Sequence, residues 1–360
     1  MVVDTNARFP LSQHIFRTHY SGGGTYSQET GTGYTPEMLK RAYCVNGAYT
    51  GKGVKIAIVA AFDNLALQEN MQMFCQEFNL PDVRISVHYP DGRNENAVRE
   101  WIVESSLDTQ WAHAFAPDAE IYTVFSQNAE VKTLLSAAEY AADELRADVV
   151  CMSFGTEESS QDASLAEFMC KKKCIFTSSS GDVGGKVSFP STSPCCISVG
   201  GTNLVVGTSG QRVSETAWRG GGGGASDVFE IAPYQGRFFD IYGMTDGKRA
   251  TPDVALCAGF EPGAAVYTSQ LGGWTTVGGT SFSNACFAGI CACIRERYPE
   301  ITTSVDVLSF LYGKAGTTGY EMPQYNFNDI VLGKSGSFYA ERGWDFATGL
   351  GSPVLCRLLL

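Results

Sequence analysis

The sequence is organised around one short stretch, Gly-Gly-Thr-Ser-Phe-Ser at residues 278–283, which runs into the apolar segment Asn-Ala-Cys-Phe-Ala-Gly-Ile at 284–290. The small residues predict a loop, and the apolar run predicts a helix that begins where the loop ends. Ser281 therefore lies at a helix N-terminus, where unpaired backbone N–H groups and the helix dipole stabilise a nearby anion. This position suits a nucleophile whose attack creates an oxyanion, although serine also caps many helices there.

A serine hydroxyl needs a neighbouring base before it acts as a nucleophile, and that base is usually histidine. The chain has four histidines. His14 and His19 lie in a polar N-terminal stretch, and His88 ends a predicted strand, Arg84–His88. A Ser-His-Asp triad is therefore not evident, and His113 is the one histidine that remains a candidate for the base.

Carboxylates on the helix predicted over Asn96–Ala114 offer a different base. Glu104 and Asp108 are four residues apart, so their side chains share one face of the helix. Two carboxylates in contact share a proton, because they do not both ionise easily. One then serves as a base while the other orients it. The alternative is a solvated acidic face on a chain of net charge −12.

A third element is the segment 173–184, which predicts a buried strand followed by a turn of small residues that exposes Asp182. The pattern Ser-Gly-Asp-x-Gly after a strand is similar to the oxyanion loop of subtilisin-like folds, with aspartate in place of asparagine. An ionised carboxylate would repel a developing oxyanion, whereas a protonated one donates a hydrogen bond to it. Such a site is expected to act at acid pH.

With these elements in this order, the chain resembles the sedolisin, or serine-carboxyl peptidase, family. That family shares the subtilisin architecture and uses glutamate in place of histidine. The resemblance extends from about Tyr34 to Pro353. The matching segments and residues are Thr35–Pro36, Leu39–Tyr43, Gly51–Val59, Glu104–Asp108, Ala116–Ile121, Met152–Gly155, the Asp182 loop, Glu215, Trp218, Gly222–Ser226, Arg249, Pro252–Val254 and Gly279–Ser281.

The resemblance implies an acid-acting serine endopeptidase that hydrolyses peptide bonds in peptide or protein substrates. It assigns Ser281 as the nucleophile, Glu104 with Asp108 as the acid–base pair and Asp182 to the oxyanion hole. Residue 154 departs from the family, which usually has tryptophan where this chain has phenylalanine; this either alters a substrate-pocket wall or reflects packing. The substrate-binding residues that the resemblance implies are Ser153, Phe154, Gly155, Ser179 and Gly181.

The family also carries a calcium site, and its matching positions lie near the C-terminus. Calcium is a hard cation that takes about 6–8 oxygen ligands. The resemblance implies one structural Ca²⁺ held by the carboxylates of Asp329 and Asp345. Backbone carbonyls would come from Ile330, Glu341 and Gly343. Without the flanking family motifs, two aspartates sixteen residues apart would be ordinary turn residues.

Length and composition fit one α/β domain. Apolar strand-like runs such as Ala265–Tyr267 alternate with helical stretches such as Leu165–Cys170, which predicts a central, mostly parallel sheet with helices on both faces. The expected organisation is a polar N-terminal leader, 1–33, and a subtilisin-like catalytic domain, 34–360. Neither nucleic acid nor membrane is an expected partner, since the pI is near 4.9 and no apolar stretch reaches about 20 residues.

The N-terminus and the cysteines raise the question of compartment. Family members usually carry a propeptide and a secretory signal, and residues 1–33 resemble neither. Either the propeptide is absent from this chain, or the protein folds without one in the cytoplasm. The twelve cysteines show no spacing of a disulfide framework. Five of them lie in predicted core strands and helices, where a free cysteine packs as a small hydrophobic residue: Cys151, Cys174, Cys286, Cys291 and Cys293. The lack of a disulfide framework favours a reducing, intracellular compartment, and an acidic vacuole remains an alternative.

Two functions of different classes therefore remain. The first is the active acid peptidase, which is favoured because Glu104, Asp108, Asp182 and Ser281 are all present. The second is a catalytically silent storage, coat or binding protein on the same fold. Peptide cleavage at low pH that Ser281→Ala abolishes would separate the two.

Overall fold

The computed structural model describes residues 33–236, 241–318 and 326–360 of the 360-residue chain. Almost all of the polar leader expected over 1–33 lies outside these residues. Within the described ranges, no helix has the length and apolarity needed to cross a bilayer.

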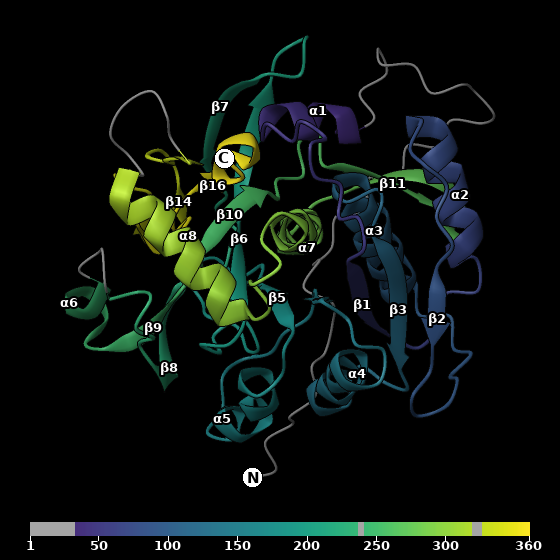
Figure 1. Cartoon of the computed structure of the whole chain (residues 1–360), viewed down its shortest axis with the longest axis horizontal. Coiled ribbons are helices and arrows are strands. Elements are labelled where there is room, and N and C mark those ends of the chain that lie inside the picture. Colours follow the sequence, from purple (N-terminus) through teal and green to yellow (C-terminus); the bar gives the residue numbers. More distant parts are fainter. Residues whose placement is uncertain (1–32, 237–240, 319–325) are drawn as a thin grey trace.

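An eight-stranded sheet runs through the molecule (Figure 1). Seven strands are mutually parallel in the order β10-β6-β5-β4-β1-β3-β2, and β7 pairs antiparallel with the second half of β6. The strands are β1 (Lys55–Ala61), β2 (Ser86–His88), β3 (Glu120–Ser126), β4 (Val149–Met152), β5 (Ile175–Ser179), β6 (Ile197–Val206), β7 (Arg212–Ala217) and β10 (Val254–Cys257).

The central strands are buried along nearly their whole length, which explains their sequence. Every residue of β4 and β5 is buried, and so is β1 from Ile56 onward. A parallel strand that is covered on both faces has a nearly continuous apolar sequence instead of an alternation of apolar and polar residues. For this reason the runs in the sequence predict these strands correctly.

Helices cover both faces of the sheet. α3 and α7 lie side by side near the centre of Figure 1 and pack on β1, whereas α4 packs on β1, β3 and β4, and α8 packs on β5. The helices are α1 (Pro36–Ala42), α2 (Leu67–Phe78), α3 (Arg99–Phe115), α4 (Val131–Asp143), α5 (Asp162–Leu165), α6 (Ile241–Thr245), α7 (Thr280–Arg297), α8 (Ser304–Thr318), α9 (Leu355–Leu358) and the 3₁₀ turns η1 (Glu167–Cys170) and η2 (Ser269–Leu271).

The remaining strands form small antiparallel pairs outside the main sheet. The apolar run Ala265–Tyr267 belongs to one such pair, although the sequence predicted it as a strand of the central sheet. A short apolar run shows that a strand is present but not which partner it takes. The pairs are β8 (Gly224–Glu230) with β9 (Lys248–Thr251), β11 (Ala264–Thr268) with β12 (Gly273–Val277), β13 (Phe327–Asn328) with β16 (Ser352–Pro353), and β14 (Lys334–Ser335) with β15 (Phe338–Tyr339).

Four of the cysteines form two disulfides, which corrects the expectation that the chain has no disulfide framework. Cys44 pairs with Cys356, and Cys170 pairs with Cys195. The partners are 312 and 25 residues apart, so no local spacing revealed them. Since disulfides persist in oxidising compartments, the cysteines no longer favour a reducing one. The eight free cysteines are all buried, which confirms core packing for Cys151, Cys174, Cys286, Cys291 and Cys293.

Candidate active site

The candidate residues gather at the carboxyl ends of the central strands. Ser153 directly follows β4, and the loop with Asp182 follows β5. The first turn of α7 lies beside that loop, because Thr280 contacts Asp182. In open parallel sheets, ligands bind at this edge, where the loops after neighbouring strands meet.

Ser281 is fully buried in the first turn of α7. The preceding Gly279 has φ 118°, a conformation that favours glycine. A Cβ on Gly278 would lie 2.6 Å from the ring of Phe260, so that position also needs glycine. Ser281 Oγ has no hydrogen-bond partner among the described residues. A buried hydroxyl without a partner costs about 1–3 kcal/mol, which is more typical of a functional group than of a structural one.

Asp182 lies against the same helix N-terminus. Its Oδ1 accepts hydrogen bonds from Thr280 N and Thr280 Oγ1, both at 2.8 Å. Gly181 N donates to Thr280 Oγ1 at 3.2 Å, which ties the loop to the helix a second time. The loop after β5 and the start of α7 are thus joined through the residue next to Ser281. These bonds bring together two of the predicted site residues.

Glu104 and Asp108 lie on α3 and are almost completely buried, with 1% and 0% of their surface exposed. Burial, and then the charge of Glu104, raise the pKa of Asp108 well above its usual value, while a hydrogen bond from Ser153 lowers it. The acidic-face alternative is therefore wrong for this pair, because neither side chain faces solvent. Two buried carboxyls in this relation favour a state in which they share one proton.

The two halves of the site are connected by side chains from β4 and α7. Ser153 Oγ donates to Asp108 Oδ1 at 3.0 Å, and Asn284 Nδ2 donates to Ser153 Oγ at 3.1 Å. The sequence implied substrate binding for Ser153 and gave no role to Asn284. The available signal was spacing, since residue 284 is three positions after Ser281 and so shares its helix face.

Comparisons with known proteins identify the family of the chain. A profile described as the subtilase family matches residues 99–351. The chain belongs to the subtilase family. It is 29% identical over 393 aligned residues to kumamolisin from Bacillus sp. (strain MN-32), covering 97% of this chain and 68% of that protein. It is 24% identical to sedolisin from Pseudomonas sp. (strain 101), covering 96% of this chain and 65% of that protein.

The fold of this subtilase also matches a solved structure, Pseudomonas sedolisin (serine-carboxyl proteinase) in complex with pseudo-iodotyrostatin. The TM-score is 0.78 at 23% identity, and the match covers 92% of this chain and 98% of that one. The predicted α/β subtilisin-like fold and the sedolisin resemblance are thereby confirmed. These relatives support a serine-carboxyl peptidase of the sedolisin type, and the chain spans about two thirds of the length of the kumamolisin and sedolisin relatives.

The ordinary subtilase arrangement with a histidine base does not fit the position of His113. His113 lies on α3 nine residues after Glu104, which is about two and a half turns, so the two side chains leave opposite sides of the helix. The ring nitrogen Nε2 contacts the carbonyl of Pro81 at 2.8 Å. Ser281 Oγ makes no hydrogen bond to it.

The other substrate-binding candidates of this subtilase differ in their surroundings. The ring of Phe154 is 0% exposed and belongs to the hydrophobic core, which favours the packing explanation for this position. Gly155 is buried beside it. Gly181 has φ 110° in the Asp182 loop, and the buried hydroxyl of Ser179 has no hydrogen-bond partner in the described chain.

The residues expected to hold calcium come together from two segments. Gly343 N donates to Asp329 Oδ1 at 3.2 Å, and Glu341 N donates to Asp345 Oδ2 at 2.9 Å. Asp345 Oδ1 also accepts from the backbone of the next turn. Among the described residues, no three His, Cys, Asp or Glu side chains gather as a metal cluster. A site of two carboxylates and three carbonyls does not require one, and this donor set fits Ca²⁺.

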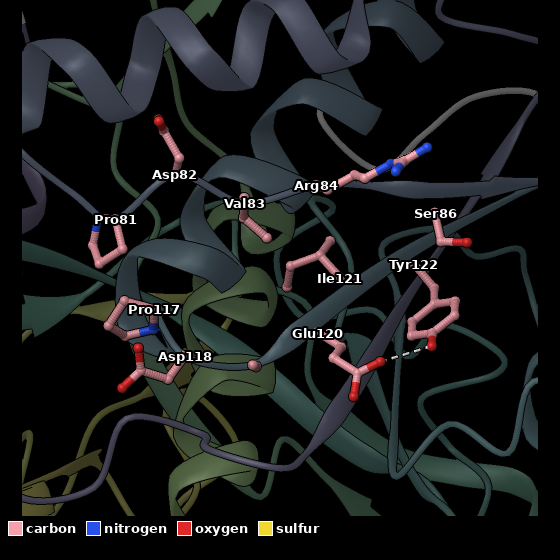
Figure 2. Close-up of a pocket in the computed structure, with 11 residues that line it drawn as sticks. Pro81, Asp82, Val83, Arg84, Ser86, Pro117, Asp118, Glu120, Ile121 and Tyr122 are labelled. Atoms are coloured by element: carbon pink, nitrogen blue, oxygen red, sulfur yellow. Dashed lines mark hydrogen bonds between the residues drawn. The ribbon is translucent and has the colours of Figure 1, made fainter.

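A separate hollow of about 350 Å³ lies at the other end of the strands, around the starts of β2 and β3 (Figure 2). Figure 2 shows that its acidic side chains, Asp82, Asp118 and Glu120, point in different directions. Glu120 accepts a hydrogen bond from Tyr122 at 2.9 Å. Because these groups do not converge on one point, the hollow does not resemble a second active site.

Proposed function

We propose that the protein is an acid-acting serine endopeptidase that cleaves peptide bonds through an acyl-enzyme on Ser281. The observation that carries the proposal is the meeting of Ser281 and Asp182 at the start of α7, with the buried pair Glu104 and Asp108 on the neighbouring helix. The family comparisons support the same class of substrate, a peptide or protein.

In the first half of the reaction, Glu104 takes the hydroxyl proton while Ser281 Oγ bonds to the peptide carbonyl carbon. The carbonyl oxygen then carries a negative charge. The backbone N–H of Ser281 lies in the first turn of the helix and has no helical carbonyl as a partner, so it can donate a hydrogen bond to this oxygen. Since Asp182 Oδ1 already accepts two hydrogen bonds, the proton that Asp182 donates to this oxyanion belongs on Oδ2.

In the second half, the carbon–nitrogen bond breaks and Glu104 returns the proton to the departing amine. Water then attacks the acyl-enzyme, its proton passes to Glu104, and the proton is finally given back to Ser281 Oγ. Asp108 keeps its own proton throughout these steps, while Glu104 accepts and returns the proton of the hydroxyl group or of water. The hydrogen bond from Ser281 to Glu104 is not formed in the structure, because Oγ has no partner; catalytic hydrogen bonds often tighten only with substrate bound.

The test is digestion of a peptide library between about pH 3 and pH 8, the interval in which carboxyl groups with raised pKa values titrate. We expect cleavage at acid pH, a fall as the pH rises, and at least a 10³-fold loss in Ser281→Ala and in Glu104→Gln. Ser136→Ala, an exposed hydroxyl on α4, is the control and should cleave normally. Absence of acid cleavage in the folded wild type would favour the silent alternative.

We also propose that Asp329 and Asp345, with the carbonyls of Ile330, Glu341 and Gly343, hold one Ca²⁺. The support is the approach of the two segments and the oxygen character of the donors. The ion would fix the C-terminal loops and would take no part in the bond-making steps.

A further inference from the structure

We propose that Asn284 and Ser153 are positioning residues that decide which oxygen of Asp108 carries the shared proton. This inference rests on the proposed function. Asn284 orients the hydroxyl of Ser153, and Ser153 donates to Asp108 Oδ1, so Oδ2 is left to carry the single proton of the Glu104–Asp108 pair.

The direction of this chain follows from counting donors. An amide NH₂ group can only donate, so Ser153 Oγ accepts from Asn284 Nδ2. The hydroxyl has a single proton, which is then available for Asp108 Oδ1. Asp108 Oδ2 is buried and has no hydrogen-bond partner among the described residues. A proton on Oδ1 would face the incoming hydroxyl proton, so Oδ2 is the favoured place for it.

Few other titratable groups near Asp108 could determine which of its oxygens carries the proton. The titratable groups that act on Asp108 or feel its charge are Glu104 on the same helix, Cys151 on β4 and Cys286 on α7. Burial raises the pKa of both thiols well above the usual value, so they stay neutral. Cys151 Sγ accepts the other N–H of Asn284 at 3.3 Å, which fixes the amide from a second side.

This chain also links the two elements of the site. Asn284 is on α7 one turn after Ser281, whereas Ser153 follows β4 and Asp108 is on α3. The helix that carries the nucleophile is therefore connected to the acid pair through two side-chain hydrogen bonds. All three side chains are buried, so water does not compete for them.

The experiment compares Ser153→Ala, Asn284→Leu and the double variant by two measurements. Loss of the hydroxyl donor destabilises the ionised form of Asp108, so the free energy of unfolding in urea should fall more at pH 7 than at pH 4. Asn284→Leu should give the same pH-dependent loss, but smaller. The double variant should lose no more than Ser153→Ala, because the two residues act in series.

The second measurement is the pH profile of kcat and KM. We expect kcat to fall about tenfold in Ser153→Ala with little change in KM, and the alkaline limb to move to higher pH. Thr109→Val is the matched control, because its hydroxyl is next to Asp108 in sequence but bonds to the backbone of Ser105. It should leave both pH dependences unchanged.

Full additivity of the two variants, or an Asn284→Leu protein with the pH dependence of wild type, would overturn the inference. If Asn284→Leu does not fold, Asn284→Ala takes its place, since it removes the amide without adding volume. An inactive wild type would contradict the proposed function alone. The hydrogen-bond chain would still be tested by the unfolding measurement, which needs no activity.

Discussion

At Asp108, the catalytic role that we propose and the stability of the fold depend on the same carboxyl group. Its carboxyl is fully buried, and burial together with the charge of Glu104 raises its pKa well above the usual value. The folded protein therefore binds a proton there that the unfolded chain gives up. This stabilisation is complete at low pH and is lost as the pH rises through the interval between the unfolded and folded pKa values.

Asp108→Asn should remove that pH-dependent loss, because asparagine resembles the protonated acid and can still accept from Ser153. We expect the variant to be more stable than wild type at pH 7 by more than about 1 kcal/mol, and the difference to shrink towards pH 4. Peptide cleavage should fall at the same time. Urea unfolding at several pH values checks this, and a variant that is less stable at pH 7 would contradict it.

At the scale of single residues, chemistry was easier to read than geometry. Ser281 and Asp182 were predictable because their local patterns put each on a loop next to a helix or strand. Asn284 was not, because its spacing from Ser281 shows only that the two share a helix face and does not show which group its amide contacts. That partner, Ser153, follows a strand more than a hundred residues earlier, and only the packing of α7 near β4 brings the two together.

Among the elements, the glycine run 220–224 is held against the Asp182 loop. Gly222 N donates to the carbonyl of Gly181 at 2.6 Å. A Cβ on Gly222 would lie 2.0 Å from the carbonyl oxygen of Ser180, so no side chain fits without moving the loop. The run therefore acts as a backbone wall for the Asp182 loop.

Gly222→Ala should displace the Asp182 loop and lower kcat by about tenfold or more, since overpacking of this kind costs about 1–3 kcal/mol. Gly221→Ala is the matched control in the same run. There the nearest atom to a Cβ is 3.4 Å away, which is ordinary contact. Measured kcat should separate the two variants, and equal activity would argue against the wall.

Helices and strands with a long, clear hydrophobic pattern in the sequence were predictable, and short segments with an ambiguous pattern were not. The central strands and α3 lie close to their predicted positions because burial on both sides leaves long apolar runs. The segment Leu165–Cys170 was predicted as a helix, but the structure has the end of α5 followed by the 3₁₀ turn η1. Such a short segment carries too few turns for its periodicity to distinguish the two.

On the scale of the whole molecule, the C-terminal loops support the active-site edge. The hydroxyl of Ser335 donates to the carbonyl of Gly221 and accepts from Gly185 N. A Cβ on Gly223 would lie 2.0 Å from the carbonyl oxygen of Phe346, the residue after Asp345. The proposed calcium loop and the Asp182 loop thus share one wall.

Removal of calcium should therefore lower both Tm and activity. With EGTA we expect Tm to fall by several degrees, at roughly 1–2 °C for each 1 kcal/mol lost in a chain of this size. Asp329→Ala should lower Tm and no longer respond to EGTA. Glu341→Ala keeps its backbone carbonyl and should respond as wild type does, whereas a wild type indifferent to EGTA would count against the ion.

The disulfide between Cys44 and Cys356 affects how cleavage of one enzyme molecule by another would be detected. It joins the start of the described domain to its last helix, so the polypeptide between them forms a covalent ring. A single nick in any surface loop of that ring opens it without releasing a fragment. The cut enzyme would migrate as one band until a reductant separates the pieces, so autolysis could pass unnoticed on a non-reducing gel.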